Sequence, residues 1–124
     1  GHTSSVWAMA NKQKTVEFQK VIHDENEWKE YISYSGTVFI EIHPSWCGPC
    51  ECIKPQLWKL SLDDESIKFC TAASEKIPTL KEFVGKVKPV FMVFKGGQKK
   101  ATIEGVNGPA IFAAINGVPV APGA

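Results

Sequence analysis

Two cysteines with two residues between them, Cys47 and Cys50, are the side chains in this sequence best suited to chemistry. A cysteine thiolate attacks disulfides, and a nearby second thiol can attack the resulting mixed disulfide and close a small ring. Gly48 lets the backbone of another molecule approach closely, and Pro49 has the fixed φ that the first turn of a helix tolerates. The pattern predicts thiol–disulfide exchange, in which Cys47 attacks and Cys50 resolves the mixed disulfide.

The elements around this pair have to place Cys47 where it is reactive. Residues 37–43 are rich in β-formers and so densely apolar that both faces of a strand are expected to be buried. A helix is expected to begin near Gly48 and run to about Leu62, with Pro55 kinking it. The first turn of a helix presents unpaired N–H groups and a partial positive charge, which would favour the thiolate of Cys47 over the thiol.

The remaining pattern predicts an α/β fold with a mixed central sheet. Strands separated by helices have to run parallel, whereas the tight turn at Gly96 and Gly97 makes the last two strands antiparallel. Helices are therefore expected on both faces of a parallel sheet that ends in a C-terminal antiparallel hairpin. Further strands are predicted at 15–18, 67–72, 89–94 and 99–104, and further helices from Asp24, from Ser74 (with Ile77, Leu80, Phe83 and Val84 inward) and around Ile111, Ala114 and Ile115.

Length and composition indicate one globular domain. The chain has 124 residues, of which 44% are hydrophobic and 22% are charged. Its net charge is only +1 and all of its basic residues are lysines, which argues against a nucleic-acid or membrane-surface partner. We expect the domain to span residues 12–117. Residues 1–11 are interpreted as the remnant of an expression tag followed by a disordered start, and residues 118–124 as a loose tail.

The four cysteines favour a reducing compartment, because three of them crowd together and cannot staple distant parts of a fold. Cys47, Cys50 and Cys52 with His43 form a conceivable zinc site, but structural zinc sites use two spaced ligand pairs and the second pair is missing. We therefore expect no metal and no other cofactor. Cys52 and Cys70 are interpreted as inert thiols, with a regulatory disulfide or glutathionylation as the alternative.

The segment Trp46–Cys47–Gly48–Pro49–Cys50, together with Pro55, Pro89, the glycine hairpin and Gly105, resembles thioredoxin over about residues 13–116. This resemblance implies the thioredoxin fold, protein-disulfide oxidoreductase activity through a Cys47–Cys50 disulfide, and recycling by a thioredoxin reductase or an equivalent enzyme. It also implies that Pro89 follows a cis peptide bond; the alternative is an ordinary proline at the start of a strand. The residues that it places against protein disulfide substrates are Trp46, Gly48, Pro49, Val87, Lys88, Pro89 and Gly105.

Several positions differ from ordinary thioredoxins. Glu41 stands where the family has a buried aspartate that helps to deprotonate the resolving cysteine, and we expect it to pass a proton to and from Cys50. The alternative is a glutamate on a solvated face of the sheet. Thr71 replaces the lysine that usually accompanies that acid, His43 replaces an aromatic residue, and Lys88 replaces an apolar residue.

These differences point to a subfamily. Residues 9–12, 69–75, 88–91 and 105–109 resemble the thioredoxin-like proteins of cilia and flagella, which include light chains of axonemal outer-arm dynein and the modules that precede nucleoside diphosphate kinase domains. The resemblance implies a cytoplasmic protein of the ciliary or flagellar axoneme, with dynein subunits as partners. It also leaves a second function open, a redox-sensitive binding subunit of dynein with little general reductase activity.

Overall fold

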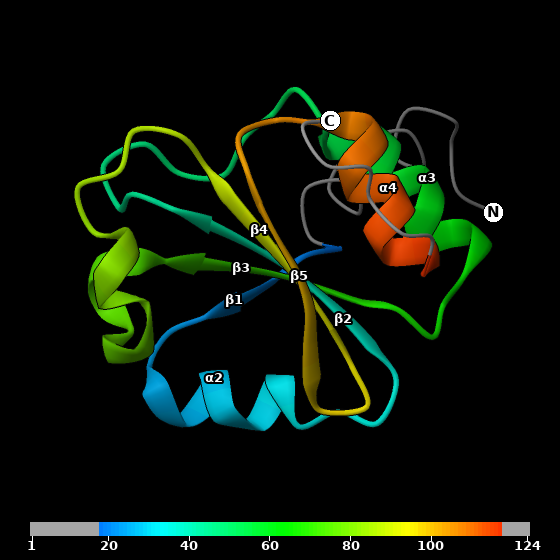
Figure 1. Ribbon diagram of the computed structural model, residues 1–124, viewed down its shortest axis with the longest axis horizontal. Coiled ribbons are helices and arrows are strands. Elements are labelled where there is room, and N and C mark those ends of the chain that lie inside the picture. The colour runs from blue at the N-terminus through cyan, green and yellow to red at the C-terminus, as the bar shows by residue number, and fades with distance from the viewer. Residues whose placement is uncertain (1–17, 118–124) are drawn as a thin grey trace, which may run out of the picture.

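The computed structural model describes residues 18–117, which form one five-stranded sheet with helices on both faces (Figure 1). The strands lie in the order β1-β3-β2-β4-β5. Their bounds are Lys20–Ile22, Lys68–Ala73, Thr37–His43, Val90–Lys95 and Gln98–Glu104 in that same order. The α/β fold with a mixed sheet is confirmed. The regions predicted as a tag remnant and as a loose tail lie outside the described residues.

The strand β2 is the centre of the sheet. It pairs in parallel with β3 and antiparallel with β4, and its residues 38–42 are all buried. The prediction that both of its faces are covered is confirmed. In this register Glu41 lies between Thr71 on β3 and Phe91 on β4.

Each face of the sheet carries its own hydrophobic cluster. On one face the helix α2 (Glu25–Ile32) and the 3-10 helix η2 (Pro78–Phe83) contribute Trp28 and Leu80 to the cluster. On the other face the helices α3 (Lys54–Asp63) and α4 (Gly108–Asn116) contribute Leu57 and Ile111. Figure 1 shows α2 along the lower side of the sheet, with α3 and α4 on the opposite side. Because side chains alternate along β2, Glu41 shares the α3 and α4 face with Phe39.

Local signals account for several element ends. Asp24 caps α2 by accepting a hydrogen bond from the N–H of Glu27 at 2.9 Å, as its spacing from that glutamate predicts. Gly96 and Gly97 have φ angles of 59° and 82°, and this pair of positive values is what a two-residue turn between β4 and β5 requires. The predicted antiparallel hairpin is confirmed.

Outside the cysteine loop, two elements are not as predicted within the described residues. Within residues 18–117 the first strand is β1 at Lys20–Ile22; of the strand predicted at 15–18, residues 15–17 lie outside the described residues, and residue 18 is not in a strand. The helix predicted from Ser74 is instead a pair of 3-10 turns, η1 (Ser74–Lys76) and η2. Pro78 explains the break, because it lacks an N–H and disfavours the helical region for Ile77, which is extended at φ −126° and ψ 109°. Val84, predicted to face inward, is 48% exposed.

Candidate active site

The cysteine pair lies in the loop between β2 and α3, which runs along the upper side of Figure 1. The thiol of Cys47 is exposed and that of Cys50 is half-buried. The N–H groups of Cys47 and Gly48 both donate to the carbonyl oxygen of Pro44 at 3.2 Å, which closes a tight turn. Gly48 adopts a φ of 77° there, a conformation that glycine reaches without strain. The turn therefore presents Cys47 to solvent, where a disulfide of another protein can reach it.

The helix predicted to begin at Gly48 begins later, at Lys54, so Cys47 does not lie in its first turn. A helix starting at Gly48 would contain Pro55 in its interior, where the missing N–H would leave a carbonyl unbonded. Because α3 begins at Lys54, Pro55 falls in the first turn, where no N–H partner is needed. The predicted kink and the predicted effect of the helix on Cys47 are therefore both wrong.

Cys50, rather than Cys47, lies next to the beginning of α3. The N–H groups of Cys52 and Ile53 lie close to the Cys50 sulfur and favour its thiolate. Burial is the larger effect and acts in the opposite direction, so the pKa of the Cys50 thiol is raised above its ordinary value. Cys50 therefore keeps its proton near neutral pH and needs a base before it can act as a nucleophile.

Glu41 is fully buried directly beneath this loop. One carboxyl oxygen, Oε2, accepts a hydrogen bond from the backbone N–H of Cys50. The other, Oε1, is buried without a hydrogen-bond partner among the described residues. Burial raises the pKa of Glu41, and the Cys50 N–H is the strongest of the neighbours that partly lower it. The structure therefore places Glu41 on a buried face beside Cys50 and rules out the alternative on a solvated face.

Two residues that the sequence did not single out complete the surroundings of Glu41. The amide of Gln19 lies near the carboxyl, and its Nε2 is likewise buried without a direct partner among the described residues. The side chain of Lys54 is also buried, donates to Glu51 at 3.2 Å, and helps to lower the pKa of Glu41. Lys54 is the first residue of α3, and no strong local signal in the sequence indicated that it would lie near Glu41. Its cation supplies a positive charge that Thr71, buried next to Glu41, cannot.

The loop before Cys47 is tied to η1. Glu75 accepts a hydrogen bond from the N–H of Ser45 at 2.8 Å and another from the hydroxyl of Ser74 at 2.9 Å. The Nδ1 atom of His43 lies 2.9 Å from the carbonyl oxygen of Pro44. These contacts fix the path of the chain from the end of β2 to the cysteine turn.

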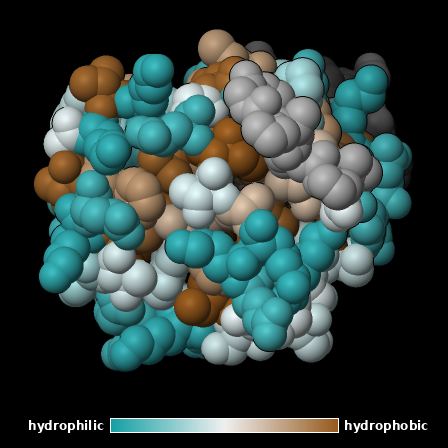
Figure 2. All heavy atoms as spheres, in the orientation of Figure 1, coloured by the Kyte–Doolittle hydropathy of each residue, from teal (hydrophilic) through white to brown (hydrophobic). Residues whose placement is uncertain are grey.

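The residues predicted to touch substrate gather around this loop from three parts of the chain. Val90 pairs with Ile42 and with Glu104, so the residues before β4 and after β5 adjoin the end of β2. Gly105 donates its N–H to the carbonyl oxygen of Pro89 at 2.8 Å, which joins these two segments. Trp46 and Val87 are 76% and 80% exposed, unusually high values for such apolar side chains. Figure 2 shows hydrophobic side chains at the upper left of the molecule, over the loops around the end of β2 and the start of β4.

The peptide bond between Lys88 and Pro89 is trans, since residues 18–117 contain no cis peptide bond. The cis bond that the resemblance implied is therefore not present. The trans form is the lower-energy isomer of prolyl bonds, and Pro89 lies immediately before β4, a position that suits a proline without an N–H. The aliphatic part of Lys88 lies against Gly105, with its Cδ 3.7 Å from the place that a Cβ on Gly105 would occupy.

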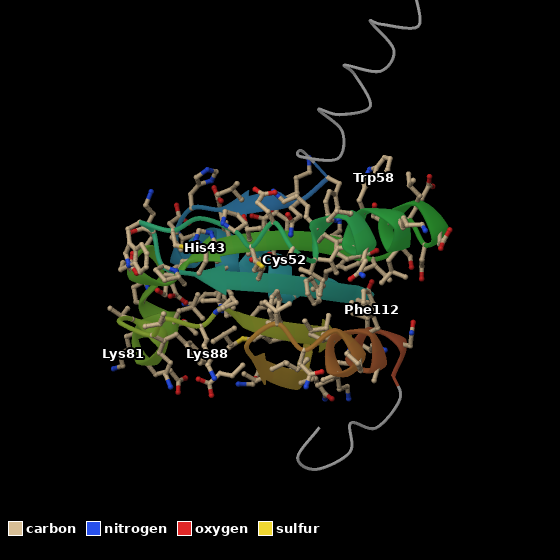
Figure 3. All side chains as sticks on the ribbon, turned by 90° about the horizontal axis from the view of Figure 1, so that it is seen from above. His43, Cys52, Trp58, Lys81, Lys88 and Phe112 are labelled. Atoms are coloured by element: carbon tan, nitrogen blue, oxygen red, sulfur yellow. The ribbon has the colours of Figure 1, made fainter. Side chains whose placement is uncertain are left out.

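The other two thiols differ from each other. Cys70 is fully buried on the opposite face of the sheet, and burial raises the pKa of its thiol to about 12. Cys52 is exposed in the loop before α3. In Figure 3 Cys52 lies near the middle of the molecule, between His43 on one side and Trp58 and Phe112 on the other.

We expect iodoacetamide at neutral pH to label Cys47 and Cys52 in the native protein and to leave Cys70 unlabelled until the protein unfolds. The physical reason is that the buried Cys70 cannot be reached by the reagent and that its thiol, with a raised pKa, does not form the reactive thiolate at neutral pH. Peptide mapping after a short reaction measures the order in which the cysteines are labelled, and a sample unfolded in urea is the control. Labelling of Cys70 at the rate of Cys47 would contradict the burial described above.

Residues 18–117 contain no group of three or more His, Cys, Asp or Glu side chains arranged to hold a metal ion. The zinc alternative therefore has no site in that part of the chain. No helix in the same residues is both long enough and apolar enough to cross a lipid bilayer.

Comparison with known proteins identifies the family. The family model for thioredoxin matches residues 12–116, which is most of the chain. The chain belongs to the thioredoxin family. Solved thioredoxins have the same fold: mitochondrial thioredoxin 3 of Saccharomyces cerevisiae, in its oxidised form, matches with a TM-score of 0.69 and 25% identity over 84% of this chain and 99% of that chain. The thioredoxin of Plasmodium falciparum matches with a TM-score of 0.63 and 25% identity over 79% of this chain and 97% of that chain.

Among curated proteins, this thioredoxin-family chain is similar to the 14 kDa dynein light chain of the flagellar outer arm of Chlamydomonas reinhardtii. The two are 42% identical over 94 residues, which cover 73% of each chain. It is also 35% identical to thioredoxin domain-containing protein 3 of Mus musculus, over 83% of this chain but only 18% of that protein. The chain thus spans most of the first relative and a small part of the second.

Proposed function

We propose that this domain is a protein dithiol–disulfide oxidoreductase whose redox centre is the Cys47–Cys50 pair. The observation that carries the proposal is the pairing of an exposed thiol with a half-buried one whose backbone N–H is bonded to a buried carboxyl. An exposed thiol suits the first attack on a foreign disulfide. A half-buried thiol on a residue whose backbone is bonded to a carboxyl, a group that can accept a proton, suits the second step, in which the acceptor controls the timing of the attack.

The exchange proceeds in two steps. The Cys47 thiolate attacks one sulfur of the substrate disulfide, forms a mixed disulfide, and releases the other substrate sulfur as a thiolate. Cys50 then loses its proton to Glu41 and attacks the sulfur of Cys47, which releases the second substrate sulfur. The substrate disulfide is reduced to two thiols while Cys47 and Cys50 are oxidised to a disulfide. A reductase such as thioredoxin reductase has to return the pair to the dithiol.

The substrate segment is expected to lie over the exposed Trp46 and Val87. We expect Gly48 and Pro49, in the turn beside Cys47, to border this segment on one side, and Pro89 and Gly105, which are joined by a hydrogen bond, to form a wall on the other side. Lys88 adds a positive charge to that wall, so a substrate with acidic side chains near its disulfide would be favoured.

The similarity to a flagellar outer-arm dynein light chain supports a second, narrower proposal. It is that the domain works in the axoneme of a cilium or flagellum, bound to dynein subunits, and that its redox state changes these contacts. Under this second proposal the protein has few substrates and weak activity toward unrelated disulfides.

One pair of measurements tests both proposals. Insulin reduction driven by dithiothreitol measures general reductase activity, and retention of axonemal proteins on the immobilised domain measures partner binding. Fast insulin reduction by the native chain, absent in Cys47→Ser, supports the oxidoreductase. Slow insulin reduction together with retained dynein subunits supports the binding subunit instead.

Trapping on beads separates thiol-dependent from ordinary binding. We expect Cys50→Ser to retain partners that elute with dithiothreitol, because Cys47 can form a mixed disulfide that no second thiol resolves. Cys47→Ser is the matched control and is expected to retain none of them. Equal yields from the two variants, compared by gel and mass spectrometry, would show that binding does not depend on the thiol.

A further inference from the structure

Cys52 places a third thiol beside the proposed redox pair. It is exposed, it follows Cys50 by two residues, and its side chain is among the neighbours that raise the pKa of the Cys50 thiol. The chain bends through residues 51–53 before it enters α3. Two alpha carbons that are two residues apart are separated by at most about 7 Å in an extended chain and by less in a bend. Disulfides form over about 4.4–6.8 Å between alpha carbons, so this bend brings Cys50 and Cys52 within bonding range.

Cys50 is only half-buried, and Cys52 is exposed in the same loop. The Cys70 thiol offers no such partner, because it is buried on the opposite face of the sheet. The cysteine loop therefore contains two possible partners for Cys50, one on each side along the chain: Cys47 in the turn and Cys52 in the bend.

We propose that Cys52 is a third exchanging thiol, which moves the disulfide from Cys47–Cys50 to Cys50–Cys52. This inference rests on the proposed function, because the substrate disulfide is the oxidant that first forms the Cys47–Cys50 bond. The Cys52 thiolate attacks the Cys50 sulfur, the bond between Cys47 and Cys50 breaks, and Cys47 leaves as a thiolate. One disulfide is exchanged for another, and no further oxidant or reductant is needed.

The consequence is an oxidised domain that keeps a free, exposed nucleophile. With Cys50 held by Cys52, Cys47 can still attack a protein disulfide, but no thiol in the loop remains to resolve the mixed disulfide. The domain would then stay covalently attached to its partner until the Cys50–Cys52 bond is reduced. The third thiol thus converts a transient reductase contact into a lasting one under oxidising conditions.

The sequence offers a direct way to distinguish the two disulfides. Glu51 lies between Cys50 and Cys52, so a protease that cleaves after glutamate separates these two cysteines, whereas no glutamate lies between Cys47 and Cys50. The full chain is equilibrated with a mixture of reduced and oxidised glutathione, quenched with acid, blocked with N-ethylmaleimide and digested without reductant. A Cys47–Cys50 bond appears within one peptide. A Cys50–Cys52 bond appears as two linked peptides in which Cys47 carries the blocking group.

We expect both disulfides in the native chain and loss of the linked peptides in Cys52→Ser, which retains the Cys47–Cys50 bond. Cys70→Ser is the matched control and is expected to leave the distribution unchanged. In Cys47→Ser, the Cys50–Cys52 bond is expected to form with oxidised glutathione as the oxidant. A Cys47–Cys50 bond in the native chain with no Cys50–Cys52 bond in any variant would overturn this inference and leave the proposed function standing. Failure of the native chain to form the Cys47–Cys50 bond would overturn the proposed function and this inference with it.

Discussion

Replacing Glu41 with glutamine is expected to slow the attack of Cys50 on a mixed disulfide at Cys47 by about 100-fold, the lower bound usual for loss of a general acid or base. Glutamine keeps the size of the side chain and can still accept the N–H of Cys50, but it cannot take up a proton. The rate of the first attack, by Cys47, should change little, because the Cys47 thiol is exposed and lies outside the buried surroundings of the Glu41 carboxyl. Rapid-quench mass spectrometry of the mixed disulfide separates the two steps.

Glu104→Gln is the matched control, since it removes an exposed carboxylate from the end of β5 without touching Cys50. Its rates for both steps should equal those of the native chain. If Glu41→Gln resolved the mixed disulfide at the native rate across neutral pH, Glu41 would not be the base for Cys50.

The same substitution should also change how the free energy of unfolding depends on pH. Because burial raises the pKa of Glu41 in the folded state, the folded protein holds this proton at pH values where the unfolded chain has lost it. The cost of ionising Glu41 is therefore absent well below 4.5, the ordinary pKa of a glutamate side chain, and grows as the pH rises from there to the folded pKa. Relative to the native chain, Glu41→Gln should gain free energy of unfolding over that interval and hold the gain above it. Urea titrations of both proteins at several pH values measure this difference in free energy of unfolding. A variant that loses stability relative to the native chain, by an amount that grows with pH, would contradict the prediction.

Phe39→Ala is expected to lower the free energy of unfolding by about 3–5 kcal/mol, a large part of the 5–15 kcal/mol that typical domains possess. Phe39 is 0% exposed, and its ring stacks on Phe91 with centroids 5.6 Å apart and tilts toward Phe69 at 5.8 Å. Removing it leaves a cavity between β2 and the helices α3 and α4 and also breaks two aromatic contacts.

Urea unfolding measures this loss, with Val84→Ala as the control. Val84 is 48% exposed, and its truncation should change stability by no more than about 0.5 kcal/mol. A loss below about 1 kcal/mol for Phe39→Ala would mean that this face of the sheet collapses around the missing ring. Because Phe39 shares its face with Glu41, the variant should also lose part of the reactivity of Cys50.

The sheet could be predicted from the sequence because its signals are local and redundant. The apolar run of β2 indicated a strand covered on both faces, and two adjacent glycines indicated the turn between β4 and β5. Glu41 is the informative exception within β2. A carboxyl in an otherwise apolar strand has to be buried at a cost or serve a purpose, and the structure places it against Cys50.

The elements that could not be predicted depend on proline and on contacts distant in sequence. Hydrophobic spacing extended α3 back to the cysteines and made one helix of η1 and η2, but Pro55 and Pro78 set the actual starts of α3 and η2. The positions of Gln19 and Lys54 near Glu41 also had no strong local signal. Gln19 comes from a distant segment, and a lysine near the start of a helix is normally an exposed residue.

A single-turnover reaction between the fully reduced domain and a peptide disulfide tests the central proposal most directly. Intact-mass measurement after acid quenching, followed by peptide mapping, should show both peptide thiols released and a disulfide that includes Cys50 in the native chain. Cys50→Ser should stop at a mixed disulfide on Cys47, and Cys47→Ser should release peptide thiol far more slowly than the native chain. A native chain that leaves the peptide disulfide intact, or that carries the peptide on a cysteine other than Cys47, would contradict the proposed dithiol–disulfide exchange.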